Sequence, residues 1–287
     1  MLEHLATAVY ATLRSVRTHP LAAFLATAFA FSWSDWLSLA ASGARIVPGH
    51  LPTDMAGMVG PAFAAFFVTA VGAGETGLKD LGLRMLRFPW RSPWFWLLAP
   101  APLWVALAVA SVLPLLGHAA PPPSSFARYP GLPAMPLVSV FDLVLVGVGF
   151  GQEVGWRGFL LPRLQQRLGP LRGAVAVAPV WGLWVLPLLV VNRAWVPADG
   201  WLLVPLAGSA VLIVSASVVL AFLVARTGGS ILGAALWHAS LRMTTVTDGG
   251  KGLVGATVVA STLIAAVGLV AVEYGMRRRG RSLLGSG

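Results

Sequence analysis

Four ionisable side chains lie within or beside apolar stretches of this sequence, where charge is costly. Glu153 and Arg157 are four residues apart, and His238 and Arg242 repeat that spacing further along the chain. Residues four apart share one face of a helix, so each pair presents its two groups together. Ionisable residues at membrane depth face the bundle interior and mark functional sites by default. We therefore expect the two helices to face each other through these side chains.

Three kinds of role fit this pattern. An acid and a base on one face could form a functional site, and the four groups together could act as a relay in a small-solute or proton-linked transporter. Alternatively, Glu153 and Arg157 form an ion pair that only neutralises both charges where the helix leaves the lipid. His238 by itself is also typical of a hydrogen-bonded core residue. The sequence shows no internal repeat, which argues against a transporter built from paired halves.

The composition indicates a membrane protein. Of the 287 residues, 57% are hydrophobic and only 10% are charged, whereas soluble domains carry roughly 25% charged residues. Because too few polar side chains remain to cover a soluble surface, the net charge of +10 is better explained by basic anchors between apolar runs than by nucleic-acid binding. The absence of cysteine excludes disulfides, thiolate metal sites and a cysteine nucleophile.

Apolar runs recur along the chain and predict an all-α, polytopic membrane helix bundle of about eight transmembrane helices. The fourth run is expected to continue through Glu153 toward Leu161. The spans form a single transmembrane domain, residues 21–274, between a cytoplasmic N-terminal segment, 1–20, and a basic cytoplasmic tail, 275–287. The predicted spans are 21–41, 56–73, 94–116, 137–151, 174–191, 201–225, 230–243 and 253–274.

The distribution of basic residues supports this topology. With eight spans and both ends inside, fifteen of the 20 lysines and arginines lie on the cytoplasmic side and five on the other. This is the bias that orients membrane proteins, so we predict a multi-pass protein of the cell membrane with both termini in the cytoplasm. The connection 74–91 is expected along the inner surface. The proline-rich stretch 118–136 is expected to be an extended, non-helical outer loop.

Three segments resemble the motifs of the CPBP family, which includes Ras-converting (type II) CAAX prenyl endopeptidases and bacteriocin-immunity-like proteins. Residues 152–165, Gln-Glu-Val-Gly-Trp-Arg-Gly-Phe-Leu-Leu-Pro-Arg-Leu-Gln, look like the first motif, Glu-Glu-x-x-x-Arg followed by Gly. Residues 180–187, Val-Trp-Gly-Leu-Trp-Val-Leu-Pro, resemble the second, an aromatic residue with histidine four positions later. His238 to Arg242 resembles the third, His-x-x-x-Asn. The resemblance covers most of the chain, from about residue 21 to residue 273.

This resemblance implies an intramembrane metalloprotease, a hydrolase. In such a site, paired glutamates and two histidines surround a divalent metal such as zinc, or an activated water. One glutamate is the general base, the histidines position metal or water, and the asparagine helps to hold the oxyanion, which meets the needs of a water nucleophile. Carried over to this chain, the catalytic set is Glu153 and His238, with Arg157 beside them.

The chain departs from the family pattern at three site positions. Gln152 replaces the first glutamate and cannot act as a base, Val185 replaces the second-motif histidine, and Arg242 replaces the asparagine. Glu153 and His238 are the metal ligands that remain, whereas catalytic zinc typically takes three protein ligands. We therefore expect no cofactor, and zinc or another divalent metal only if the protease assignment holds.

These departures predict a degenerate catalytic set. We expect a CPBP-type pseudoenzyme with lost or impaired peptidase activity, whose inherited cavity takes a lipid, a prenyl group or a membrane peptide. The alternative is an active endopeptidase in which Glu153 is the base and His238 orients water without metal. Expected partners are the lipid bilayer and a prenylated or membrane-embedded peptide, and not nucleic acid. We also expect Arg242 to pair with Glu153 in place of the metal, with Arg157 competing for the same carboxylate.

Overall fold

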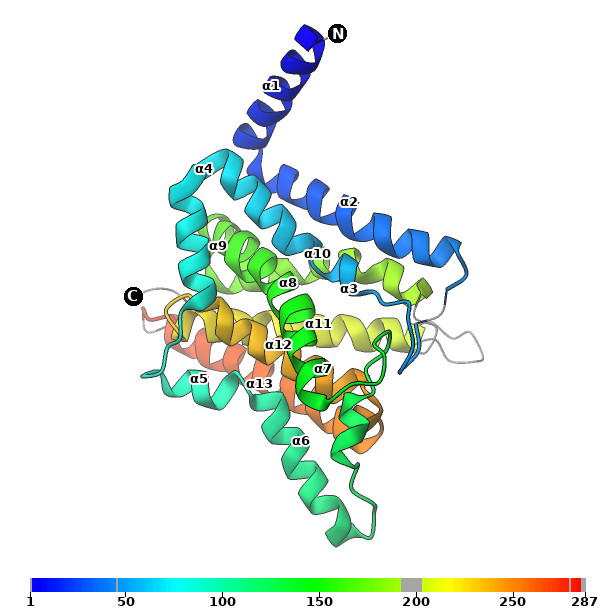
Figure 1. Cartoon of the computed structure of the whole chain (residues 1–287). Helices are drawn as coiled ribbons and strands as arrows, with labels where there is room; N and C mark the ends of the chain where they lie inside the picture. The colour runs from blue at the N-terminus through cyan, green and yellow to red at the C-terminus, as the bar shows by residue number, and fades with distance from the viewer. Residues whose placement is uncertain (1, 45, 192–202, 279, 285–287) are drawn as a thin grey trace.

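The computed structural model describes residues 2–44, 46–191, 203–278 and 280–284, and over these residues it is an all-α membrane helix bundle without strands (Figure 1). Within these residues, three short 3₁₀ segments and two π-helical segments lie between the α-helices. The α-helices are α1 (Leu2–Thr18), α2 (Pro20–Ala41), α3 (Met55–Met58), α4 (Gly60–Leu86), α5 (Pro93–Leu98), α6 (Ala101–Val112), α7 (Leu137–Val144), α8 (Gly151–Glu153), α9 (Leu161–Leu168), α10 (Pro170–Val191), α11 (Leu203–Arg226), α12 (Ile231–Val246) and α13 (Leu253–Arg277).

The eight predicted spans all contain helix, but they differ in how well they could cross a bilayer. Five helical segments of the described chain are long and apolar enough to do so. The polytopic helix bundle is therefore confirmed, whereas the count of eight is not. Those five segments are Met55–Leu86, Leu137–Leu168, Pro170–Leu188, Leu206–Arg226 and Leu253–Arg277.

The other three predicted spans fall short for different reasons. α2 has sufficient length, but Asp35 and neighbouring serines lower its apolar character. The predicted span 94–116 is interrupted, because α5 ends at Leu98 and α6 begins only at Ala101, after Pro100. α12 has 16 residues, which is short for an independent span. Residues 201–202, at the start of the sixth predicted span, lie outside the described residues.

The fourth span is one continuous rod from Leu137 to Leu168, as the sequence predicted when it extended this span past Glu153. Two parts of the rod are π-helical, η3 (Leu145–Phe150) and η4 (Val154–Leu160), and they flank the α-helical turn that carries Gln152 and Glu153. π-Helical segments inside α-helices are frequently found at functional sites.

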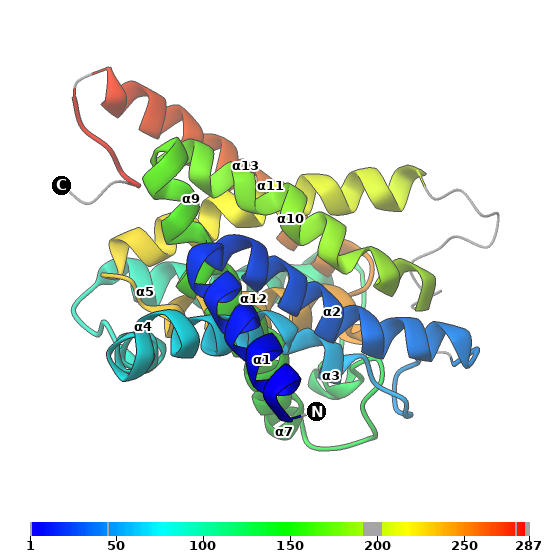
Figure 2. The same cartoon turned by 90° about the horizontal axis from the view of Figure 1, so that it is seen from above.

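Glycines let this rod approach its neighbours closely. A Cβ atom on Gly149 would lie 2.6 Å from the backbone oxygen of Ala235 in α12, and one on Gly155 would lie 2.5 Å from Pro61 in α4. Small residues at helix contacts allow backbones to pack against each other in membranes. The rod crosses α12, which lies in the middle of the bundle in both views (Figures 1 and 2). This close crossing brings the first and third motifs together.

The connections differ in part from the expected ones. The stretch 118–136 is mostly irregular, but it contains a 3₁₀ turn, η2 (Pro123–Ala127), so the prediction that it holds no helix is wrong. The inner connection predicted at 74–91 is largely the second arm of α4, which bends at Gly74, where φ is +60° (Figure 1). A positive φ favours glycine, because it carries no Cβ. The cytoplasmic side of residues 1–20 stays a prediction.

Candidate functional site

Glu153 and Arg157 form a buried ion pair on the central rod. The guanidinium Nη1 of Arg157 lies 3.1 Å from Oε2 of Glu153 and donates to Oε1 at 3.2 Å. Both side chains are 0% exposed. The four-residue spacing therefore produces the expected pairing, in a place where neither charge reaches solvent or lipid. Taking two charges out of water is costly, and the pair must compensate for that cost by contact within the protein.

His238 approaches the same carboxylate from α12. Its Nδ1 lies 2.6 Å from Oε1 of Glu153, and its ring is almost fully buried. The structure thus brings together the three predicted catalytic residues, Glu153, Arg157 and His238, from the rod and from α12. A carboxylate held against an imidazole in this way can fix the orientation of the ring and accept or return a proton through it.

Arg242 has a partner that the sequence did not predict. Its Nε and Nη2 donate to the hydroxyl of Tyr129 at 3.1 and 2.9 Å. Tyr129 comes from the loop before α7 and is fully buried. Arg157, the competitor named for the Glu153 carboxylate, contacts it at 3.1 Å, and the pairing of Arg242 with Glu153 stays a prediction. Tyr129 lies in a loop, so no helical spacing could predict its contact with Arg242.

A buried carboxyl completes the surroundings of Arg242. Asp54, just before α3, is 2% exposed. Burial raises the pKa of the Asp54 carboxyl, and the positive charge of Arg242 acts in the opposite direction. Burial also raises the pKa of the Tyr129 hydroxyl, which therefore stays neutral and can accept from Arg242. Arg242, Tyr129 and Asp54 form a second polar cluster, one helical turn along α12 from His238.

Trp181 of α10 connects Gln152 with Arg157 and His238. Its Nε1 donates to Oε1 of Gln152 at 3.0 Å, and Nε2 of Gln152 is 3.3 Å from the sulfur of Met58. The indole also lies 4.8 Å below the guanidinium carbon of Arg157 and 5.1 Å from the ring of His238. This one side chain of α10 therefore contacts Gln152 and Arg157 of the first motif and His238 of the third.

A cavity of about 620 Å³ opens beside this cluster. Its wall includes Gln152, Val185 and Arg242, the three positions at which the chain departs from the family motifs, together with His238. The rest of the wall is mostly apolar, and most of its residues come from α10 and α11. The volume is within the range of small-molecule sites, roughly 300–1,000 Å³. The cavity therefore combines a polar end with an apolar body.

Comparison with known proteins matches this part of the chain to a protease family. The sequence profile described as "Type II CAAX prenyl endopeptidase Rce1-like" matches residues 133–244, which include all three motif segments. This is a CAAX-protease-like membrane protein. A protein named CAAX prenyl protease 2, from Methanococcus maripaludis, is 34% identical to it over 58 residues, which are 20% of this chain and 21% of that protein. The predicted resemblance to CPBP-family proteases is confirmed.

The donor atoms of this CAAX-protease-like site do not fit a catalytic zinc ion. Val185 offers no ligand atom, the amide oxygen of Gln152 accepts from Trp181, and the carboxylate of Glu153 is in contact with a guanidinium. A typical zinc site needs three protein ligands and an open position. Among the residues that the structure describes, no group of three or more His, Asp or Glu side chains could hold a metal ion.

Sequence reasoning missed three residues of the site. Trp181 had a signal, because it is the aromatic residue of the second motif, four positions before Val185 and thus on the same helix face. Tyr129 and Met58 had none that spacing could supply. Both come from segments whose path relative to α12 and the rod is set by packing, and neither carries a charge that would single it out.

Proposed function

We propose that this CAAX-protease-like membrane protein binds a membrane peptide or its prenyl group in the cavity, and that it does not hydrolyse peptides by a metal-dependent mechanism. The observation that carries the proposal is the wall of the cavity. The three substituted positions, Gln152, Val185 and Arg242, border the same space as His238. A site without metal ligands but with a cavity can still bind a ligand. It has no metal ion to polarise the ligand's carbonyl group.

The polar end of the cavity favours binding over metal-dependent catalysis. The carboxylate of Glu153 is already in contact with Arg157 at 3.1 Å and His238 at 2.6 Å. A divalent cation near this carboxylate would also meet the positive charges of Arg157 and Arg242, which would repel it. Glu153, Arg157 and His238, which would otherwise lie around a metal, contact each other instead.

The apolar end sets the class of ligand. Leu186, Leu212 and Ile213 line it, and they come from α10 and α11. An occupant must therefore present an apolar surface on one side and hydrogen-bonding groups toward Gln152, His238 and Arg242 on the other. A prenylated or membrane-embedded peptide has both, since its prenyl or apolar side chains fill the body and its backbone amides meet the polar end.

The test uses the purified protein in lipid nanodiscs with a farnesylated CAAX-type peptide that carries a photo-crosslinker. We expect crosslinking without cleavage. Ile213→Trp, which fills the cavity, should reduce crosslinking by about tenfold, as expected when roughly 1.4 kcal/mol of binding is lost. The matched control is Ile264→Trp on α13, where Ile264 is 71% exposed and no effect is expected. Equal crosslinking of both variants, or zinc-dependent cleavage, would refute the proposal.

A second candidate is an endopeptidase that works without metal, with Glu153 as base and His238 orienting water. The 2.6 Å contact between the two side chains favours it. So do three buried polar atoms without a hydrogen bond within the described chain. They are Nε and Nη2 of Arg157, and Oε2 of Glu153, whose 3.1 Å contact with Arg157 is an ion pair only. Buried polar atoms normally have a protein or water partner, and a water held here would meet a carboxylate.

Cleavage of the same peptide separates the two candidates. If the second is correct, cleavage persists in a chelator such as EDTA, disappears in Glu153→Gln and falls in His238→Asn. The first predicts no cleavage in any of these samples, with crosslinking retained in Glu153→Gln. Because Glu153→Gln leaves Arg157 without its counter-charge, a lower unfolding midpoint is expected, and the control for folding is a cooperative thermal transition of each variant above the assay temperature.

A further inference from the structure

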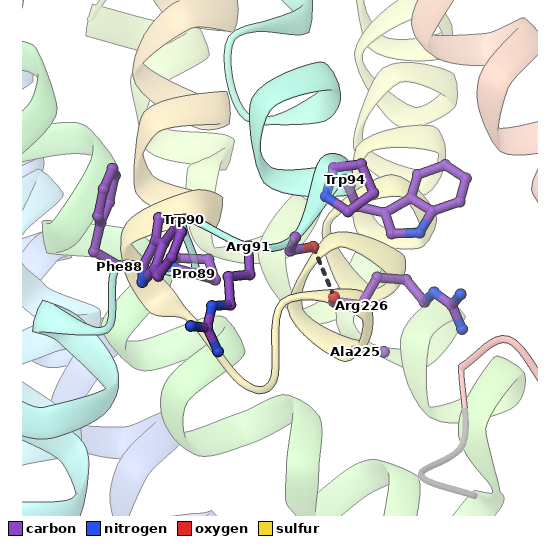
Figure 3. A pocket seen from close by; sticks show the side chains of 9 residues that line it. Phe88, Pro89, Trp90, Arg91, Trp94, Ala225 and Arg226 are labelled. Carbon is purple, nitrogen blue, oxygen red and sulfur yellow. Dashed lines mark hydrogen bonds between the residues drawn. The ribbon is translucent and has the colours of Figure 1, made fainter.

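A pocket of about 670 Å³ lies away from the motif cluster, between the α4–α5 connection and the end of α11 (Figure 3). Its nine lining residues include two arginines, two tryptophans and a serine, and none of them is acidic. We propose that this pocket binds the phosphate of an anionic phospholipid headgroup. The lining residues are Phe88, Pro89, Trp90, Arg91, Ser92, Pro93, Trp94, Ala225 and Arg226.

The two segments that form the pocket are fastened to each other. The hydroxyl of Ser92 donates to the backbone oxygen of Arg226 at 3.1 Å, the contact drawn as a dashed line in Figure 3. The hydroxyl of Ser230 donates to the backbone oxygen of Arg87 at 2.7 Å, and the Arg87 guanidinium donates to the backbone oxygen of Gly228. The α4–α5 connection and the α11–α12 turn therefore form one preorganised site, so ligand binding does not have to order either segment.

Each pocket arginine rests on a tryptophan. The guanidinium carbon of Arg91 lies 4.6 Å from the centre of the Trp90 ring, and that of Arg226 lies 5.7 Å from the Trp94 ring. Trp94 is itself packed edge-on against Phe222 of α11 at 5.1 Å. Planar guanidiniums held in this way retain hydrogen-bond donors at their edges, and a phosphate group accepts such donors in pairs.

The surroundings favour a lipid phosphate over a soluble one. Phe88, which lines the pocket, is 51% exposed, and Trp96 and Leu97 of α5 are 53% and 61% exposed, so these side chains give an apolar surface along which acyl chains can lie. Tryptophan is also typical of the membrane interface, at the depth of the headgroups. Basic pockets between transmembrane helices are a recurring means of binding anionic headgroups. The site uses no residue of the Glu153 network, so it is independent of the function proposed above.

The experiment measures binding of fluorescent phosphatidylglycerol to the purified full-length protein in nanodiscs of phosphatidylcholine. The test variant is Arg91→Gln with Arg226→Gln. Each arginine near an anionic surface strengthens binding roughly five- to sixfold, so losing both should weaken it about 30-fold. The control pair, Arg167→Gln with Arg172→Gln, removes the same charge from exposed positions on α9 and α10 and should leave binding within about twofold. Arg91→Lys with Arg226→Lys tests whether paired guanidinium contacts matter beyond charge, and partial loss is expected.

Three outcomes would overturn the proposal. The first is equal binding of phosphatidylcholine and phosphatidylglycerol by the unaltered protein. The second is an equal loss in the control pair, since the effect would then be one of net charge. The third comes from a competition arm with inorganic phosphate. Displacement of the lipid by millimolar phosphate would identify a soluble phosphate site, whereas resistance to it supports the lipid headgroup.

Discussion

Two Glu–Arg pairs of this protein share the same four-residue spacing and differ in almost everything else. Glu153 and Arg157 are both 0% exposed, in the middle of the bundle. Glu273 is buried but its partner Arg277 is 40% exposed, at the end of α13. Glu273 also accepts from the hydroxyl of Ser282 and the backbone amide of Leu283, at 2.7 and 2.6 Å. The second carboxylate is therefore well supplied with donors, whereas the first depends on Arg157 and on His238.

The comparison shows what the spacing can and cannot predict. A separation of four residues predicts a contact in both cases, because the geometry of the helix alone sets it. The energetic role of that contact depends on burial. An ion pair whose cation reaches solvent and whose carboxylate keeps other donors contributes at most about 1 kcal/mol, while removing one member of a fully buried pair leaves a charge without compensation. Removing only one member of the Glu153–Arg157 pair should therefore destabilise the protein more than removing one member of the Glu273–Arg277 pair.

The largest expected effect comes from breaking the buried pair. Arg157→Ala leaves the Glu153 carboxylate buried without its cation, and we expect a loss of about 3–5 kcal/mol in the free energy of unfolding. Arg277→Ala, the same substitution in the other pair, should cost less than about 1 kcal/mol. Denaturant unfolding of both variants in detergent micelles measures the difference.

A double variant separates lost charge from lost packing. In Glu153→Ala with Arg157→Ala no buried charge remains, so the protein should regain part of the stability that Arg157→Ala loses. If the double variant is less stable than the single one, the two side chains stabilise the protein by packing and not by charge. The predicted contrast between the two ion pairs would then be wrong. Equal losses for Arg157→Ala and Arg277→Ala would lead to the same conclusion.

The sequence predicted the fold class and the helix-borne part of the site because both follow from periodicity. Apolar runs specify the helices, and spacing along two of them specifies that Glu153, Arg157 and His238 are available on given faces. What it could not predict is which loop residue meets a helix residue. Arg242 was assigned to Glu153 by charge alone, and packing also places Tyr129 beside it. The break in the span 94–116 also depends on how Pro100 is accommodated, and the count of spans changes with it.

The contact that the sequence missed gives the next prediction. Tyr129→Phe removes the acceptor of two hydrogen bonds from the Arg242 guanidinium, and we expect a loss of about 2 kcal/mol in the free energy of unfolding, since bonds to charged groups are the stronger kind. The control is Tyr274→Phe, where the hydroxyl accepts from Arg278 at 3.1 Å at an exposed position and its loss should have little effect. A similar small change in both variants would mean that Tyr129 does not hold Arg242.

The smallest expected effect tests the hydrogen bond between the second motif and Gln152. Trp181→Phe removes an indole N–H that donates to Oε1 of Gln152 at 3.0 Å. Trp184→Phe makes the same substitution one turn along α10, where the buried Nε1 has no hydrogen-bond partner within the described residues. Both variants lose ring volume, but only the first loses a bond. Side-chain hydrogen bonds between membrane helices contribute about 0.6 kcal/mol on average.

The difference between these two variants isolates that bond. Trp181→Phe should be the less stable by about 0.6 kcal/mol, measured as a difference in the free energy of unfolding under identical detergent conditions. Gln152→Leu provides the other half of the comparison, because it removes the acceptor and should bring the two tryptophan substitutions to equal cost. If Trp184→Phe proves the more destabilising, ring packing in the α10 core outweighs the bond. Gln152 would then owe its place in the site to the cavity it lines and not to Trp181.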